Sequence, residues 1–229
     1  MTTVLAARPG EDAARLLVRA EALDQRLWHL PAPLAQARDA RGHLHAGGVS
    51  ITSVATDVAG LEAAAAAGAA LRVRAIVVEG GRLEGRDPEE AADALVRALH
   101  APLVAGAPFV IRNGAGPDAL LGFVATEWLL SELPRLGFWF DGSAALARQR
   151  AGVGPDAMAW MDAYGTRCGG LFVHGLGAQG LGGQHPGDDG ADWDALSSAL
   201  PAAAPRVLTM DPAHDEAAIA DGLRFVRSL

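Results

Sequence analysis

The sequence predicts a compact single α/β barrel, the (β/α)8 or TIM-barrel fold. Short apolar runs rich in Val, Ile, Leu and Phe alternate with longer alanine-rich amphipathic stretches, which is the rhythm of βα units. Eight apolar runs fit this rhythm, and eight is the number of strands in such a barrel. The chain has 229 residues, or about 29 per unit, so we expect one domain over residues 1–229 without long insertions.

The apolar runs are the expected strands. They are almost continuously apolar, as strands are when a parallel sheet is buried on both faces. In chain order they cover residues 3–7, 26–30, 49–54, 75–79, 109–113, 138–141, 171–174 and 206–210. A doubly wound open sheet shows the same alternation and remains the structural alternative.

Helices are expected in the segments between these runs. They cover residues 12–23, 34–45, 58–71, 88–103, 126–136, 155–164, 192–200 and 215–228. Most of them begin beside Asp, Pro or Thr, the residues that helix starts prefer. The clearest start is Asp87-Pro88-Glu89-Glu90, with proline in the first turn and two carboxylates facing the helix dipole.

Composition and charge exclude several classes of protein. Half of the residues are hydrophobic and the formal net charge is −8, with basic residues scattered singly, so we expect no nucleic-acid partner. Cys168 is the lone cysteine and cannot form an internal disulfide. The first residues lack a basic region followed by an apolar core, and the alanine tract at 63–67 is too short to span a bilayer. We therefore expect a soluble cytoplasmic protein that contacts no membrane.

The most informative segment lies near the end of the seventh predicted strand. Leu171-Phe172-Val173 runs directly into His174, and a glycine-rich polar loop carrying His185 follows. An α/β barrel presents its ligand-binding residues at the carboxyl ends of the strands, so this segment predicts a site at that end. The glycine-rich pieces do not follow the dinucleotide-binding fingerprint, and no nucleotide cofactor is expected.

From Phe138 onward the sequence resembles the xylose isomerase-like TIM-barrel superfamily, which includes sugar phosphate isomerases and epimerases and the AP endonuclease family 2 type. Many members carry Asp-Thr-Gly-His at one strand end, a later strand ending in His, then Pro-Gly-Glu-Gly followed by Asp-Trp, and a last strand ending in Glu. Here the corresponding stretches are Asp141 to Ala144, His174, residues 186–193 and Thr209. The first half of the chain agrees with the superfamily in rhythm only.

The resemblance implies a divalent-metal site, and the sequence departs from it at several of the expected ligands. Arg112 stands where a strand-end Glu is expected, Ala144 where the histidine is expected, and Thr209 where the last Glu is expected. A guanidinium group there would repel a cation. We therefore expect a degenerate metal site and no metal cofactor. The alternative is a divalent metal such as Mn, Zn or Mg in a site partly rebuilt by Glu79 and Asp211.

Four strand ends supply the main candidate residues, each with a structural alternative. His174 is a candidate proton carrier or a hydrogen-bonded cap of a buried strand. Asp141 is a candidate general base or the cap of a turn. Glu79 is a proton-transfer carboxylate or an ion-pair partner of Arg112. Arg112 binds an anionic ligand or forms a structural salt bridge with Glu79 or Asp141.

Three further residues are candidates for substrate binding, and the strand-end site admits two functions. His185 is a loop ligand or a surface histidine, and His29 and Trp28 form an aromatic wall or part of the core. The first function is an enzyme of the isomerase or epimerase type acting on a small sugar-like or hydroxy-carbonyl metabolite. The second is a non-catalytic barrel that binds a metabolite or a protein. The exposed alanine-rich helices could also pack against a second copy, so a homo-oligomer is possible.

Overall fold

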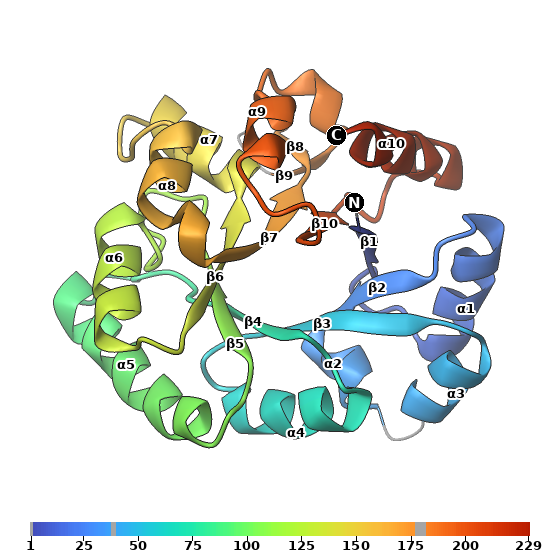
Figure 1. The fold of residues 1–229 in the computed structure, drawn as a ribbon, viewed down its shortest axis with the longest axis horizontal. Coiled ribbons are helices and arrows are strands. Elements are labelled where there is room, and N and C mark those ends of the chain that lie inside the picture. The colour runs from blue at the N-terminus through green and yellow to red at the C-terminus, as the bar shows by residue number, and fades with distance from the viewer. Residues whose placement is uncertain (1, 38–39, 177–181) are drawn as a thin grey trace.

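The computed structural model describes residues 2–37, 40–176 and 182–229, and it shows a closed parallel barrel surrounded by helices (Figure 1). Each barrel strand pairs with the next one along the chain, and the last strand pairs with the first. The barrel strands are β1 (Thr2–Ala6), β2 (Leu27–Leu30), β3 (Ser50–Thr56), β4 (Ala75–Glu79), β5 (Phe109–Arg112), β6 (Gly137–Asp141), β7 (Cys168–Val173) and β10 (Pro205–Leu208). The closed order confirms the predicted barrel over the open-sheet alternative.

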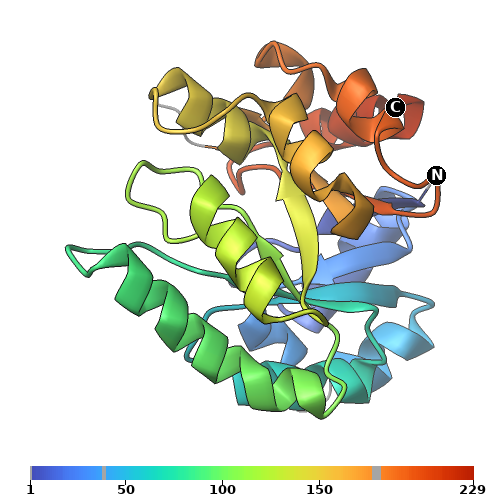
Figure 2. The same cartoon turned by 60° about the vertical axis from the view of Figure 1, so that its left-hand side comes forward.

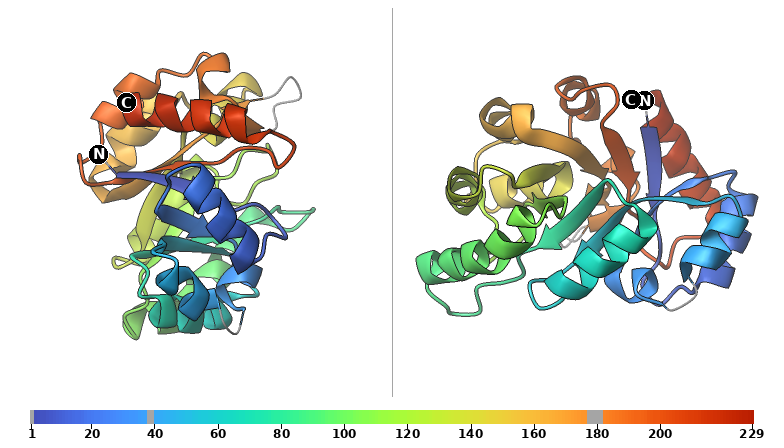
Figure 3. Two further views of the ribbon diagram at one scale, coloured as in Figure 1. Left: turned by 90° about the vertical axis from the view of Figure 1, so that its right-hand side faces the viewer. Right: turned by 60° about the horizontal axis from the view of Figure 1, so that its bottom comes forward.

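Helices cover the outside of the barrel, and α5 and α6 lie side by side on one flank (Figure 2). The α-helices are α1 (Ala13–Ala22), α2 (Ala32–Ala35), α3 (Ala40–Ala46), α4 (Leu61–Leu71), α5 (Pro88–Val104), α6 (Phe123–Glu132), α7 (Gly142–Arg150), α8 (Ala157–Tyr164), α9 (Trp193–Ser198) and α10 (Glu216–Ser228). Helix α10 packs beside β1 and β10, where the sheet closes (Figure 3). Within the described ranges, none of the helices combines the length and the apolar character that crossing a bilayer requires.

The observed elements differ from the predicted ones in three places. The helix expected over 34–45 is two short helices, α2 and α3, and residues 38–39 between them lie outside the described residues. Helix α7 was not predicted. A small antiparallel pair, β8 (Gly175–Leu176) and β9 (Gly182–Gln184), follows β7. The part of the glycine-rich loop at 177–181 lies outside the described residues.

Aspartates begin many of the helices. The side chain of the residue before the first helical turn accepts a hydrogen bond from a backbone N–H of that turn, which would otherwise lack a partner. The aspartates in this position are Asp12, Asp87, Asp141, Asp156, Asp192 and Asp215. Four of these helices, α1, α5, α7 and α10, directly follow a barrel strand, so Asp12, Asp87, Asp141 and Asp215 lie on the side of the carboxyl ends of the strands.

Alternation along the strands separates an inner from an outer core. Successive strand residues face opposite sides of the sheet. The outer side packs against the helices, and the inner side fills the barrel with a small cluster. That inner cluster contains Val4, Ala75, Val77, Trp139, Phe172 and Val207. The same alternation decides which residues face the mouth of the barrel.

Candidate functional site

The mouth of the barrel is lined by one residue from each of the eight strands. Each residue lies at or just beyond a strand end, on the inward-facing side of its strand. They are Ala6, His29, Ala55, Glu79, Arg112, Asp141, His174 and Thr209, and all of them line a cavity of about 700 Å³. A cavity of this size suits a small metabolite. The structure thus brings Glu79, Arg112, Asp141 and His174 together on four neighbouring strands, β4 to β7.

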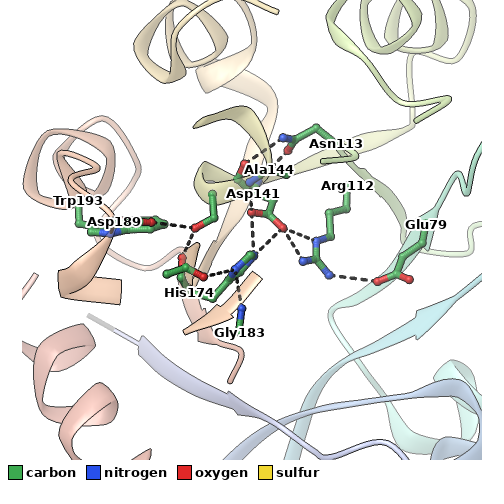
Figure 4. Close-up of polar contacts among 11 residues, drawn as sticks. Glu79, Arg112, Asn113, Asp141, Ala144, His174, Gly183, Asp189 and Trp193 are labelled. Atoms are coloured by element: carbon green, nitrogen blue, oxygen red, sulfur yellow. Dashed lines mark hydrogen bonds and ion pairs between the residues drawn. The ribbon is translucent and has the colours of Figure 1, made fainter. Parts of the chain in front are cut away.

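Arg112 lies between two carboxylates (Figure 4). Its Nε and Nη2 both donate to Oδ2 of Asp141, at 2.9 and 2.5 Å, and its Nη1 donates to Oε1 of Glu79 at 3.1 Å. Adjacent strands align these residues, because Arg112 is in register with Glu79 on β4. A guanidinium group has five N–H donors, so two of them remain for a ligand. This geometry fits the predicted salt bridge.

The ion pairs shift the pKa of both buried partners. Burial alone would lower the pKa of Arg112, but the carboxylates of Asp141 and Glu79 outweigh burial and raise it above the ordinary value. Burial would likewise raise the pKa of Asp141, but His174 and Arg112 outweigh it and hold that pKa well below the usual range. Asp141 is therefore a stable anion and a weak proton acceptor.

His174 contacts the same carboxylate from its own strand end. Its Nε2 lies 3.0 Å from the carboxylate oxygens of Asp141, and its Nδ1 lies 3.3 Å from the backbone nitrogen of Gly183 (Figure 4). Nδ1 also lies 3.4 Å from the carbonyl oxygen of Gly175, so whether it donates or accepts depends on the tautomer, whereas Nε2 faces the carboxylate of Asp141. Gly183 has a φ of +100°, and a Cβ on it would lie 2.9 Å from the nitrogen of Asp211. A glycine is therefore required where β9 approaches the site.

Two features hold Asp141 in place, and the sequence analysis missed the first of them. The side chain of Asn113 donates to the carbonyl of Asp141 at 2.9 Å and accepts from its N–H at 2.7 Å. The N–H of Ala144, in the first turn of α7, donates to Oδ1 of Asp141 at 2.8 Å. Asp141 is therefore both the cap of a helix and the centre of the polar site. The Asn side chain directly after strand β5 was the available sequence signal.

An aromatic floor lies beneath the polar groups. The guanidinium carbon of Arg112 lies 4.1 Å from the ring centroid of Phe172, and the ring of His29 meets Phe172 edge-on at 5.4 Å. Nδ1 of His29 lies 2.8 Å from the hydroxyl of Ser53. Burial and the nearby charge of Arg112 lower the pKa of His29 to about 3. His29 is thus a neutral imidazole at the mouth.

Comparison with solved structures finds proteins of similar fold. No protein-family model matches the chain, and no curated protein matches its sequence. The 3-keto-D-glucoside 4-epimerase of E. coli is 11% identical, with 100% of both chains covered and a TM-score of 0.79. The chain has the xylose isomerase-like barrel fold.

Two further structures of this kind support the assignment of the fold. A xylose isomerase domain protein from Planctomyces limnophilus is 14% identical, covering 99% of this chain and 95% of its own, with a TM-score of 0.70. An AP endonuclease of family 2 from Brucella melitensis is 12% identical, covering 100% and 99%, with a TM-score of 0.74. At these identities the likeness concerns the fold.

The residues in the mouth of the barrel do not fit a divalent cation. Arg112 occupies the space between Asp141 and Glu79, where a metal would have to sit. Asp211 lines the mouth, but its carboxylate accepts from the N–H of Ala213 at 2.8 Å. Among residues 2–37, 40–176 and 182–229, no three His, Cys, Asp or Glu side chains are arranged to hold a metal ion. The guanidinium instead supplies the positive charge between the carboxylates.

Two predicted ligand-binding residues lie away from the mouth. The side chain of Trp28 is fully buried in the outer core, and its Nε1 donates to the carbonyl of Gln25 at 2.9 Å. His185 faces α10, where its Nε2 lies 3.2 Å from Asp221, and it does not line the cavity. The geometry therefore supports the structural alternative for both residues: core packing for Trp28 and a surface ion pair for His185.

Proposed function

We propose that the mouth binds a neutral, sugar-like hydroxy-carbonyl compound and isomerises or epimerises it without a divalent metal. The observation that carries this proposal is the position of Arg112, whose guanidinium is held between Asp141 and Glu79 inside the cavity. The fold adds support, because its neighbours include a sugar epimerase and xylose isomerase-like proteins. Fold likeness alone does not determine an activity, so the argument rests on the site.

The charges of the mouth favour a neutral ligand over an anionic one. The cavity lining carries four carboxylates, from Glu79, Asp118, Asp141 and Asp211, against the two guanidinium groups of Arg82 and Arg112. A phosphate or carboxylate ligand would enter a site that already holds surplus negative charge. The same surplus, with the net charge of −8, opposes the phosphate backbone of a nucleic acid.

Unused hydrogen-bonding groups suit a ligand with several hydroxyls. Arg112 keeps two N–H donors, and half of the Glu79 side chain, 52%, is exposed. The hydroxyl of Thr209 is buried at the mouth and finds no hydrogen-bond partner among the described residues. A buried hydroxyl without a partner costs about 1–3 kcal/mol, which a ligand hydroxyl would recover. Ala6 and Ala55 leave space beside these groups.

Glu79 is the group best placed to move a proton. One of its oxygens accepts from Arg112, and the side chain stays open to the cavity. Glu79 would take the proton from the carbon beside the substrate carbonyl, which leaves an enediolate. Return of the proton to the former carbonyl carbon, while the hydroxyl proton passes from one oxygen of the enediolate to the other, gives the isomer. Delivery of a proton from water to the opposite face of the original carbon, with Glu79 keeping the proton it took, gives the epimer. The spare N–H donors of Arg112 would stabilise the negative oxygen of the enediolate.

The other candidates take supporting roles in this scheme. Asp141 orients Arg112, and His174 holds Asp141. His29, a neutral imidazole, is suited to hydrogen-bond a substrate oxygen. The sequence contains no lysine, which excludes an imine intermediate on a side-chain amine.

A second candidate function, binding without catalysis, has one observation in its favour. Asp141 and His174 use their polar atoms on each other and on their surroundings, so neither is free for proton transfer. The two functions therefore differ in whether Glu79 transfers a proton. In the binding-only alternative, Glu79 would serve as an acceptor for ligand hydroxyls.

The proposal is tested in two steps. Neutral aldoses, ketoses and keto-sugars, with their phosphorylated and acidic counterparts, are first screened by thermal shift. Compounds that bind are then incubated with the protein in D2O, and NMR follows deuterium entering beside the carbonyl. We expect neutral compounds to bind, exchange to occur, and Glu79→Gln to abolish exchange while binding stays. Glu132→Gln, an exposed change on α6, is the matched control.

Two results would overturn parts of this proposal. Binding without deuterium exchange would favour the non-catalytic function. Preferential binding of the phosphorylated or acidic compounds would refute the neutral-ligand argument.

A further inference from the structure

A second cavity lies at the opposite end of the barrel from the mouth. It has a volume of about 640 Å³ and surrounds the amino-terminal ends of β1 to β4, where Thr2, Leu27, Ser50 and Arg74 line it. None of its lining residues belongs to the mouth. Its volume falls in the range of small-molecule sites.

The charge of this cavity is opposite to that of the mouth. Arg72 and Arg74 line it together with His45, and the described residues of its lining include no carboxylate. In the described part of the chain, neither arginine takes part in an ion pair or a side-chain hydrogen bond. A third arginine, Arg26, directly precedes the lining residue Leu27, and its Nη1 lies 3.3 Å from the carbonyl of Gly47. Cations thus gather here on a protein whose net charge is −8.

Local backbone structure fixes the position of Arg72. It ends α4 in the left-handed conformation, with a φ of 55°, and its N–H bonds to the carbonyl of Ala69 at 3.2 Å. Arg74 follows two residues later, directly before β4. A short loop held at both ends by a helix and a strand therefore presents two guanidinium groups to one cavity.

The remaining walls combine hydroxyl groups and apolar side chains. Ser50 and Thr52 are hydroxyl-bearing residues of β3, and Thr52 is the extra residue where the pairing of β2 with β3 shifts register. Leu44 and Leu71 supply an apolar side from α3 and α4. Arginine pairs bind phosphate through several parallel N–H···O bonds, and apolar walls accept the organic part of an ester.

We propose that this cavity binds a small organic phosphate, separately from the ligand of the mouth. The two guanidinium groups of Arg72 and Arg74 take the phosphate, and the apolar wall takes the organic part. The inference does not rest on the activity proposed for the mouth, because the two cavities share no residue.

Calorimetric titration with AMP, inorganic pyrophosphate and adenosine tests this inference. The wild type should bind AMP saturably, adenosine much more weakly, and both phosphates less tightly as salt increases. The double variant Arg72→Asn/Arg74→Gln removes both charges, and asparagine tolerates the left-handed backbone at position 72. It should weaken AMP binding by about tenfold or more, as expected for the loss of charge-assisted hydrogen bonds.

Two single variants serve as controls. Arg97→Gln removes an exposed charge from α5, and Arg112→Gln changes the mouth. Both should bind AMP as the wild type does. The proposal is overturned if the wild type binds neither phosphate, if adenosine binds as tightly as AMP, or if a correctly folded double variant binds AMP like the wild type. Loss of AMP binding in an Arg112→Gln variant that is shown to be folded would instead place the phosphate in the mouth, and this result would also refute the proposal.

Discussion

Arg112 directs two N–H donors, Nε and Nη2, at the single oxygen Oδ2 of Asp141, at 2.9 and 2.5 Å. The Asp141 side chain is 2% exposed and that of Arg112 is 20% exposed, so the pair is largely removed from water. An ion pair in such a place is costly to break, because the charge left behind has neither its partner nor its hydration shell. The stability and the metal binding of the protein should therefore depend on Arg112 and on the residues that contact it or Asp141.

Removing the charge of Arg112 should destabilise the fold. Arg112→Gln leaves the Asp141 carboxylate buried and without its cation. We expect unfolding in urea to show a loss of about 3 kcal/mol, at the low end for buried pairs because a fifth of the arginine side chain is exposed. Arg97→Gln, an exposed change on α5, should stay within about 0.5 kcal/mol of the wild type. An equal loss of unfolding free energy in the two variants would show that the ion pair of Arg112 and Asp141 does not stabilise the fold.

His29 should make stability depend on pH. Its pKa is lowered to about 3 by burial and by Arg112, while in the unfolded chain it is about 6.5. Between these values the unfolded state binds a proton that the folded state does not, so stability falls as pH decreases. The contribution of one such group is about 1.4 kcal/mol per pH unit. Urea midpoints at pH 7, 6 and 5 should therefore fall more steeply for the wild type than for His29→Gln, and parallel curves would contradict the assignment.

Asn113 should be needed to hold the backbone of Asp141. Asn113→Ala leaves a buried N–H and a buried carbonyl without partners. We expect a loss of about 2–3 kcal/mol in the free energy of unfolding. Gln149→Ala removes an exposed amide side chain from α7 and provides the control. A loss below about 0.5 kcal/mol for Asn113→Ala would mean that water replaces the side chain.

Arg112 should also control metal binding. Protein purified without a histidine tag should contain no stoichiometric Mn, Zn or Mg, and chelation should leave its melting temperature unchanged. Arg112→Ala removes the cation between Glu79 and Asp141 and leaves the two carboxylates facing the vacated space, with His174 beside Asp141. Such a group can attract a divalent ion. Added Mn²⁺ or Zn²⁺ should therefore raise the melting temperature of Arg112→Ala but not of the wild type, and stoichiometric metal in the wild type would refute the metal-free proposal.

The barrel was predictable because its strands are regular. All eight predicted strands are present with small shifts at their ends, and 75–79 matches β4 (Ala75–Glu79). Helix α7 was not predicted because it begins with Gly142 and Ser143, which are weak helix formers, and because its apolar residues follow little helical periodicity. The helix over 34–45 was predicted as one element because its apolar pattern runs on across α2 and α3.

The residues of the polar site were predictable because they lie at strand ends. Two of the predicted ligand-binding residues, Trp28 and His185, do not line the mouth. Glu79, Arg112, Asp141 and His174 lie at the ends of neighbouring strands and on the inner side, as the alternation requires. Trp28 and His29 are consecutive, so they face opposite sides of the sheet and cannot both line the mouth. The pairing of His185 with Asp221 depends on how α10 packs, which no local pattern reveals.

Asp141 serves two structures at once, since Oδ1 holds the first turn of α7 while Oδ2 holds Arg112. A ligand that draws Arg112 away from this carboxylate changes the acceptor on which the Ala144 amide depends. We therefore expect hydrogen exchange at the Ala144 amide to change when such a ligand occupies the mouth, even for a compound that is never turned over.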